Sequence, residues 1–186
     1  MADSLCRVAI EICDYDVRWP DLAAAACAEL DAAVPDVFVT IEHVGSTAIP
    51  GMAAKPVIDL MAATETLDAA LRAEDVLGTL GYHRGETGMR NRLFYARNAP
   101  EDDTRRTHHL HVVTVDTWDT RNERLLRDHL RTHPEDAVRY ATLKQRLRRD
   151  GHDGDAYTRA KTALIQELVD RARADRGLPS VPVWED

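Results

Sequence analysis

The sequence contains no stretch near the ~20 consecutive apolar residues that a helix needs to cross a bilayer, although 44% of its 186 residues are hydrophobic. Its first residues, Met1 to Ser4, lack the basic region and apolar run that begin a secretory signal peptide. We therefore expect a cytoplasmic protein with no membrane partner. Aromatic residues make up only 5% of the chain, so we expect a core built mainly from Val, Leu, Ile and Ala.

Cysteine is also scarce, and acidic residues outnumber basic ones. The three cysteines, Cys6, Cys13 and Cys27, lie near the N-terminus without the spacing of a metal site, so we expect reduced, partly buried thiols. A formal net charge of −8 argues against general affinity for nucleic acid or anionic membranes, because both need a basic surface. It leaves room for a small phosphorylated ligand held by a few Lys or Arg residues. Nothing in the sequence predicts the oligomeric state.

Hydrophobic periodicity divides the chain into a strand-rich part and a helical part. Strands are predicted at residues 5–13, 37–44, 57–62, 82–86, 92–97 and 108–115. Helices are predicted at residues 19–34, 66–80, 118–132, 135–149 and 155–174. The polar segment 98–107 is typical of a mobile loop.

This order predicts an α+β fold: a mixed β-sheet flanked by helices, with a C-terminal helical segment. We expect the α/β core in residues 1–116 and the helical segment in residues 117–176, packed on the core in one compact domain. Residues 177–186 contain two prolines and should form an irregular tail.

The most informative motif follows the predicted strand at 37–44. A strand that ends at Gly45-Ser46 lets the backbone turn sharply and present amide N–H groups and a hydroxyl, which suits phosphate oxygens. Asp59 on the next predicted strand could hold a divalent cation beside those phosphates. An isolated Gly-Ser is also typical of an ordinary tight turn, with the Asp bonded to loop amides.

Two histidines on the predicted strand at 108–115 extend this pattern. Alternation places His109 and His111 on one face, whereas His108 points the other way. With Asp59 they would form a two-His-one-carboxylate set, which suits Zn, Mn or Fe better than Mg. The alternative is one structural His bonded to a backbone carbonyl and another exposed to water.

The segment from His43 to Asp59 closely resembles the signature of the GrpB family, His-x-Gly-Ser-Thr-Ala-x-Pro-Gly-x-x-Ala-Lys-Pro-x-Ile-Asp. Later blocks are similar too, so the resemblance covers roughly residues 8–170; they include Arg92-Leu93-Phe94, His109-Leu110-His111-Val112, Arg127 to Pro134, Tyr140-x-x-x-Lys144 and Tyr157-x-x-x-Lys161. The resemblance implies the fold of the DNA polymerase β-like nucleotidyltransferases. Related domains also occur fused to dephospho-CoA kinase.

In that superfamily the Gly-Ser turn binds a nucleoside triphosphate, and an Asp-x-Asp pair with a third carboxylate binds two magnesium ions. The matching positions are Gly45, Ser46 and Asp59, but the second acid of the pair falls at Met61. One metal-bridging acid is therefore missing, although two-metal transfer depends on clamping the attacking and leaving oxygens together. We expect catalytic roles for Asp59 and His111, and a divalent metal (Mg, Mn or Zn) at Asp59, His109 and His111. A nucleoside triphosphate is the candidate substrate.

Further side chains are predicted to contact the phosphorylated ligand. Lys144 and Lys161 each follow a Tyr by four residues, which stacks each pair on one helix face. These pairs could line a lid over the site, or could simply be packed Tyr with Lys stems lying along them. The full set of predicted ligand contacts is Gly45, Ser46, Thr47, His43, Lys55, Arg92, Lys144 and Lys161.

Three functions are compatible with these residues. The working hypothesis is a nucleotidyltransferase-like enzyme that transfers a nucleotidyl or similar activated group to an unknown acceptor. The second is a non-catalytic module that binds a phosphorylated ligand and has lost a metal site. The third is a metal-dependent enzyme of different chemistry, hydrolysis or ligation, on the His-His-Asp face. A fold alone does not decide between them.

Overall fold

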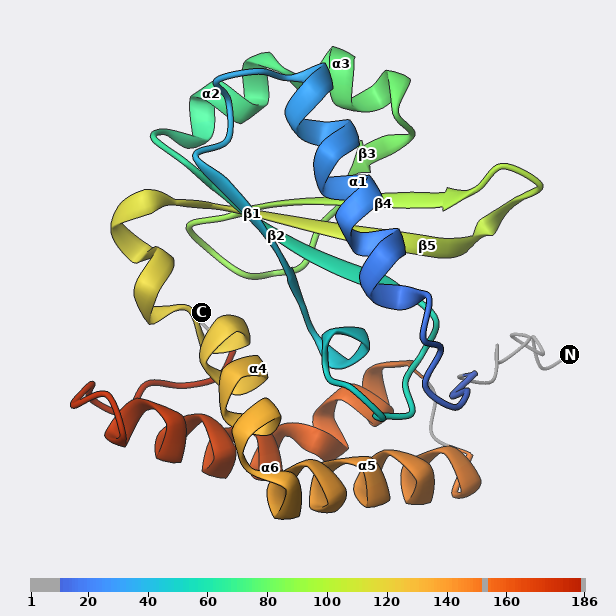
Figure 1. Ribbon diagram of the computed structural model, residues 1–186, viewed down its shortest axis with the longest axis vertical. Coiled ribbons are helices and arrows are strands. Elements are labelled where there is room, and N and C mark those ends of the chain that lie inside the picture. The colour runs from blue at the N-terminus through green and yellow to red at the C-terminus, as the bar shows by residue number, and fades with distance from the viewer. Residues whose placement is uncertain (1–10, 152–153, 185–186) are drawn as a thin grey trace, which may run out of the picture.

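A five-stranded mixed sheet forms the centre of the molecule in this computed structural model, which describes residues 11–151 and 154–184 (Figure 1). The strands are β1 (Thr40–Val44), β2 (Ile58–Thr64), β3 (Tyr82–Arg84), β4 (Leu93–Ala99) and β5 (Asp102–Thr114). Their order is β1-β2-β5-β4-β3, in which β2 and β5 are parallel and the other neighbours are antiparallel. The predicted mixed sheet is therefore confirmed.

Two groups of helices flank this sheet. Figure 1 shows α1, α2 and α3 near the top of the view, whereas α4, α5 and α6 gather at the bottom. The helices span Trp19–Ala33 (α1), Leu67–Arg72 (α2), Glu74–Thr79 (α3), Asn122–Thr132 (α4), Pro134–Arg149 (α5) and Gly154–Ala174 (α6). Short 3-10 turns lie at Ser46–Ala48 and Val115–Thr120. This arrangement confirms the predicted α+β class.

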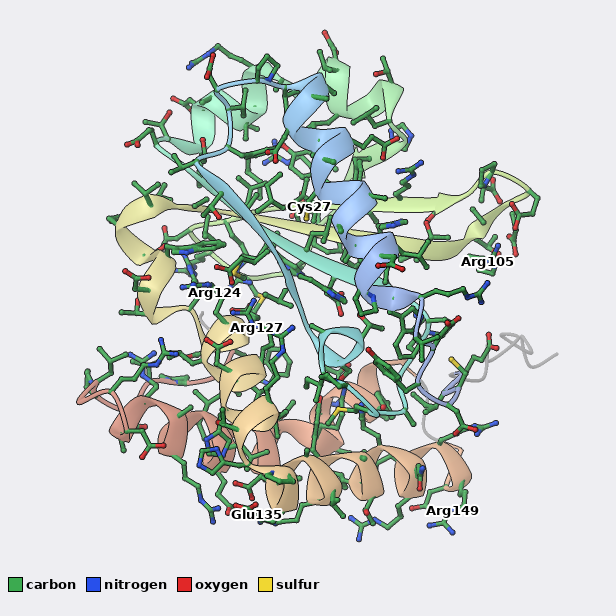
Figure 2. All side chains as sticks on the ribbon, viewed as in Figure 1. Cys27, Arg105, Arg124, Arg127, Glu135 and Arg149 are labelled. Atoms are coloured by element: carbon green, nitrogen blue, oxygen red, sulfur yellow. The ribbon has the colours of Figure 1, made fainter. Side chains whose placement is uncertain are left out.

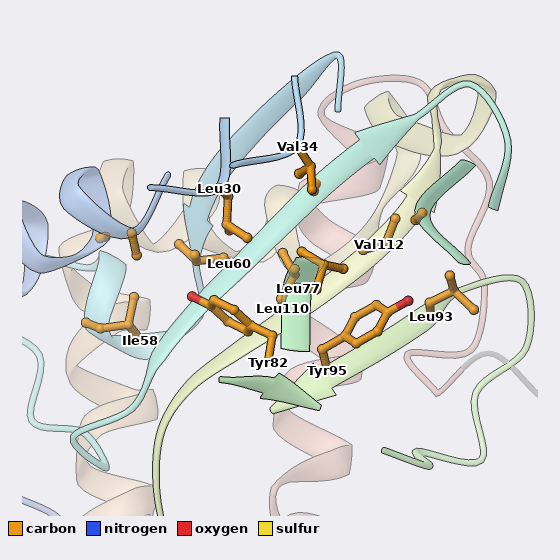
Figure 3. Close-up of a cluster of buried hydrophobic side chains, with 14 of the residues drawn as sticks. Leu30, Val34, Ile58, Leu60, Leu77, Tyr82, Leu93, Tyr95, Leu110 and Val112 are labelled. Carbon is orange, nitrogen blue, oxygen red and sulfur yellow. The ribbon is translucent and has the colours of Figure 1, made fainter. Parts of the chain in front are cut away.

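Strand alternation gives the sheet two different faces. Leu60 and Leu110 are fully buried and belong to the core that also contains Leu30 of α1 and Leu77 of α3 (Figure 3). The residues on either side of Leu60 in β2, and of Leu110 in β5, face the other way. There Met61 packs with Trp118 and other apolar side chains, and this second face also carries Asp59 and His109.

The loop between β1 and β2 packs against the C-terminal helices. Ile49 and Met52 of this loop are buried in one cluster with Leu130 of α4 and Leu168 of α6. Burying an apolar side chain of this size contributes about 1.5–3 kcal/mol, so the cluster holds the loop between the sheet and the helices. Residues 178–184 after α6 form no helix or strand, and Val183 joins the same cluster.

Two predictions of local structure were wrong, and one cannot be compared. Segment 98–107 is not a loop, because β4 and β5 continue into it as a hairpin in which Asn98 pairs with Arg106. The Oδ1 of Asp102 accepts hydrogen bonds from the amide and hydroxyl of Thr104, which orders the start of β5. The helix predicted at 66–80 is divided at Ala73 into α2 and α3. Most of the strand predicted at 5–13, including Cys6, lies outside the described residues.

None of the described helices is both long and apolar enough to cross a membrane.

Candidate functional site

The turn after β1 lies directly against Asp59. Val44 and Asp59 are opposite each other in the register of β1 and β2, so residue 45 begins the turn beside the carboxylate. Gly45 has φ +71°, and a Cβ there would lie well inside 3.0 Å of the Asp59 Oδ2. Both the positive φ and this close approach require glycine. The sequence therefore brings a sharp turn and an acid side chain to one place.

His43 and Thr47 hold the shape of this turn. The Oγ1 of Thr47 donates to the carbonyl of Val57 over 3.2 Å. The Nε2 of His43 lies 2.9 Å from this Thr47 Oγ1. Since the hydroxyl proton is used, His43 Nε2 is the donor of the second bond. Burial lowers the pKa of His43 to about 4, so the ring is neutral at pH 7. His43 thus positions the turn.

A cavity of about 270 Å³ opens beside the turn, between the sheet and helices α5 and α6. It gathers most of the predicted site residues, and Val57, Tyr157 and Thr158 complete its wall. The predicted residues that line it are Ser46, Thr47, Lys55, Asp59, His109, Lys144 and Lys161. A larger cavity of about 530 Å³ lies between α5 and α6 and contains none of them. The smaller cavity is therefore the candidate site.

Two lysines of the helical layer enter this cavity with unusual properties. Lys144 is only 2% exposed, and its Nζ donates to the carbonyl of Ala53 over 2.7 Å. Burial and the neighbouring charge of Lys161 lower the pKa of Lys144 to about 7, and burial lowers that of Lys161 to about 8. Each Nζ also lies over the ring of the Tyr four residues earlier, at 4.9 Å from Tyr140 and 4.1 Å from Tyr157. The lysines thus pack on tyrosines and face the cavity as well.

Asp59 and His109 form a hydrogen-bonded pair across the parallel strands β2 and β5. They are opposite each other in the register, and His109 Nδ1 lies 2.8 Å from Asp59 Oδ1. Burial alone would raise the pKa of Asp59, but the hydrogen bond from His109 and the nearby histidines outweigh it and lower that pKa. The carboxylate is therefore ionised and accepts the Nδ1 proton. The buried Nε2 of His109 has no hydrogen-bond partner among the described residues.

The structure does not bring His111 and Arg92 to the cavity. His111 lies opposite Met61 in the register, two residues further along β5, with the ring of Phe94 5.0 Å from its own. The side chain of Arg92 is 1% exposed and forms an ion pair of 2.5 Å with Glu123 of α4. This contact neutralises a largely buried carboxylate, so Arg92 is not available to a ligand in the cavity.

The geometry gives little support to a three-ligand metal site on this face. Met61 is fully buried, and the neighbouring strand presents His109 rather than an acid beside Asp59. The donor atoms of Asp59, His109 and His111 do not gather within 4.8 Å of one another, a span that ligands of one ion share. The residues therefore do not fit a two-metal site, and metal binding here stays a prediction.

Sequence reasoning missed the residues that fix α4 to the turn. Arg127 donates to the carbonyl of His43 over 3.0 Å and forms an ion pair of 2.6 Å with Glu42 of β1. One helical turn later, Arg131 donates to the carbonyl of Ala48 over 2.9 Å. Figure 2 shows Arg127 on α4, on the side of the helix toward β1. The spacing of four residues between these arginines was the available signal, because it places both on one helix face.

The sequence model of the GrpB protein family matches residues 9–171. The chain belongs to the GrpB family. The UPF0157 protein PA4798 of Pseudomonas aeruginosa is 37% identical over 174 residues, which are 92% of this chain and 71% of that protein. The crystal structure of GrpB from Enterococcus faecalis has a TM-score of 0.80 and 26% identity, and the match covers 90% of this chain and 99% of that one.

A longer protein also contains a similar region. The dephospho-CoA kinase of Mycolicibacterium paratuberculosis is 29% identical over 197 residues, which cover 90% of this chain and 47% of the kinase. The predicted family resemblance is therefore confirmed over nearly the whole chain.

Proposed function

We propose that this GrpB-family chain binds the phosphate groups of a nucleotide or another phosphorylated small molecule in the cavity beside Gly45 and Ser46. The distribution of lysine carries the proposal. The chain has 24 Lys and Arg residues, of which only three are Lys, leaving 24 − 3 = 21 Arg. All three lysines, Lys55, Lys144 and Lys161, line this one cavity.

Such a concentration of amines needs a counter-ion. Burying a cationic side chain costs free energy, which is why the pKa values of Lys144 and Lys161 are lowered to about 7 and about 8. A phosphate group in the cavity would stabilise their charged forms and accept hydrogen bonds from them. Ser46 and Thr47 of the turn add polar side chains to the wall of the same cavity. Phosphate binding is therefore expected to draw protons onto the lysines.

Lysine charge also takes the place of metal charge in this proposal. Asp59 is the one carboxylate of the expected metal set, since Met61 and His109 occupy the places beside it. The ammonium groups of Lys144 and Lys161 enter the same cavity and attract the Asp59 carboxylate. We therefore expect phosphate binding that persists in a chelator.

One observation favours a transfer reaction as a second candidate function. His109 lines the cavity, and its pairing with Asp59 through Nδ1 leaves the buried Nε2 without a hydrogen-bond partner among the residues described. This nitrogen could take the proton of an acceptor hydroxyl as its oxygen attacks the α-phosphorus of a nucleotide and pyrophosphate leaves. His109→Asn should then stop turnover and leave nucleotide binding intact. A purely binding module would show no turnover in the wild type or in His109→Asn.

Calorimetry of ligand binding tests the main proposal. ATP, tripolyphosphate and dephospho-CoA would be titrated into the full chain in EDTA and again with Mg²⁺. We expect saturable binding of at least one of them in EDTA, and loss of that binding in Lys161→Met and Lys144→Met. A ligand at a hundred times its Kd should also stabilise the fold by about 2.7 kcal/mol in a thermal unfolding assay.

The matched control is Arg105→Met, which removes one positive charge from the exposed β4–β5 hairpin (Figure 2), at a residue that does not line the cavity. This variant should bind like the wild type. Binding that is equal in all four proteins, or absent for every ligand, would contradict the proposal.

A further inference from the structure

A second cluster of ligating side chains lies where α4, α5 and α6 meet, away from the candidate cavity. His129 and His133 are four residues apart at the end of α4, a spacing that places them on the same face. Asp175 directly follows the last residue of α6. One donor atom from each of the three residues lies within 4.8 Å of the others. Among residues 11–151 and 154–184, this is the one group of at least three His, Cys, Asp or Glu residues whose donor atoms lie this close together.

His129 carries the strongest sign that a ligand binds there. The residue is 6% exposed, and its Nε2 forms a hydrogen bond of 2.8 Å with Asp136 Oδ2. Its other ring nitrogen, Nδ1, is buried and has no hydrogen-bond partner among the described residues. A structural histidine explains the bond to Asp136 but not the second nitrogen, because leaving a buried polar atom unpaired costs about 1–3 kcal/mol. A bound cation would satisfy that lone pair.

The surroundings of the two rings resemble the outer shell of a metal site. Asp136 is 1% exposed and is itself held by Arg139 at 2.8 Å and by Arg171 at 3.1 Å. His133 Nδ1 lies 2.9 Å from the carbonyl of His129, which leaves Nε2 as the free nitrogen of that ring. Metal-binding histidines commonly donate their second N–H to a carboxylate or a backbone carbonyl in this way.

We propose that His129, His133 and Asp175 bind one divalent transition-metal ion of the zinc class. Two imidazoles and one carboxylate suit Zn²⁺ and its neighbours, whereas Mg²⁺ and Ca²⁺ prefer all-oxygen sites. The two rings are stacked with centroids 4.0 Å apart and planes 14° apart. Lone pairs of parallel rings do not converge on one point, so the more exposed ring of His133 has to tilt when the ion binds.

The ion would join the end of α4 to the end of α6, beside the start of α5. These helices carry Lys144 and Lys161, but the three proposed ligands do not line the candidate cavity. The proposal is therefore independent of the phosphate site, and either can fail without the other.

Zinc titration of the full chain tests this site. After dialysis against a chelator, the wild type should bind one equivalent of Zn²⁺ by calorimetry and unfold at a higher temperature when zinc is present. His133→Ala and Asp175→Asn remove partly or fully exposed ligands, so both should fold and bind zinc at least tenfold more weakly. Asp136→Asn leaves all three ligands in place and should weaken binding by about 10–100-fold.

Two controls separate this site from other histidines. His83→Ala removes an exposed histidine of β3 and should leave zinc binding unchanged. The double variant His109→Ala/His111→Ala should also keep one zinc equivalent, whereas loss there would move the ion to the candidate cavity and overturn the proposal. Unchanged affinity in both His133→Ala and Asp175→Asn, or no saturable zinc binding by the wild type, would overturn it as well.

Discussion

Gly45 packs closely against the side chain of Asp59, which lines the candidate cavity together with the next residue of the turn, Ser46. The register places Val44 opposite Asp59, so the chain turns over the carboxylate immediately after β1. A side chain at residue 45 would collide with the Asp59 Oδ2. The space for a ligand beside Ser46 therefore depends on the absence of a Cβ at residue 45.

Gly45→Ala should abolish binding of ATP or tripolyphosphate. Alanine adds the collision with Asp59 to the backbone strain of φ +71°. Gly51→Ala is the matched control, because Gly51 has φ +76° but open space around its Cβ position. Both variants should be destabilised, by about 1–2 kcal/mol for the strain alone, and only Gly45→Ala should lose the ligand by calorimetry. Equal binding by the two variants would contradict the role of this contact.

Phosphate binding should weaken as the pH rises through about 7 to 8, the pKa values of Lys144 and Lys161 in the free protein. Above these values the amines are neutral, and binding must then take protons from solvent. Calorimetry in buffers of different ionisation enthalpy should therefore show proton uptake near pH 8. Lys144→Met and Lys161→Met should each reduce the number of protons taken up. Binding without any buffer dependence would argue against lysine as the phosphate partner.

The same two lysines predict the alkaline stability of the protein. Their folded pKa values lie below the ordinary lysine pKa of 10.5, so the unfolded chain binds more protons above pH 7. The contribution of these lysines to the free energy of unfolding should therefore rise from about pH 7 toward 10. It opposes any general loss of stability at alkaline pH. Urea denaturation of the wild type and of Lys144→Met should show a smaller rise in the variant. Parallel curves would mean that Lys144 titrates normally in the folded state.

His43 predicts the acid limb of the stability curve. Its pKa is lowered from 6.5 to about 4, so the unfolded chain takes up a proton first and stability falls as the pH drops through this window. His108, lowered to about 4 by burial, adds to the same loss. His43→Gln keeps a side-chain N–H for Thr47 and should lose less stability between pH 6.5 and 4. The exposed His83→Gln should follow the wild type. If His43→Gln loses as much stability over this pH range as the wild type does, His43 is not the group responsible.

Restoring the missing acid should not restore a metal site. Met61 is fully buried among Val44, Ala63, Val113 and Trp118. Met61→Asp would bury an unpaired carboxylate, and we expect a loss of about 3 kcal/mol or more in urea denaturation. Met61→Leu keeps the volume and should cost less than about 1.5 kcal/mol. A stable Met61→Asp protein that gains Mg²⁺-dependent nucleotide binding would show that position 61 can still serve a metal.

Strand alternation predicted that His109 and His111 lie on one face of their strand and His108 on the other. In the structure Asp59 of β2 lies on the same face of the sheet as His109, and Leu60 and Leu110 lie on the opposite face. The pairing of Asp59 with His109 rather than His111 could not be predicted, because it depends on the register of two strands that lie fifty residues apart. A shift of two residues in that register would have paired Asp59 with His111 instead.

Charged side chains were harder to place, because their partners are distant in sequence. Arg92 looked available to a ligand, yet it is paired with Glu123, thirty-one residues later. The convergence of Lys144 and Lys161 on the Gly-Ser turn likewise depends on how α5 and α6 pack below the sheet, which periodicity within each helix does not specify. The four-residue spacing of His129 and His133 was visible in the sequence. Asp175, which has a donor atom within 4.8 Å of theirs, follows a different helix.

The central claim is that the three lysines bind the phosphate groups of one ligand, and amine labelling tests it most directly. The native full chain would be treated near neutral pH with an amine-reactive reagent, with and without ATP or tripolyphosphate, and modified residues would be identified by mass spectrometry. We expect the ligand to protect Lys55 and Lys161 together, while the N-terminal amine reacts equally in both samples. Labelling of the lysines that is unchanged by saturating ligand would contradict it.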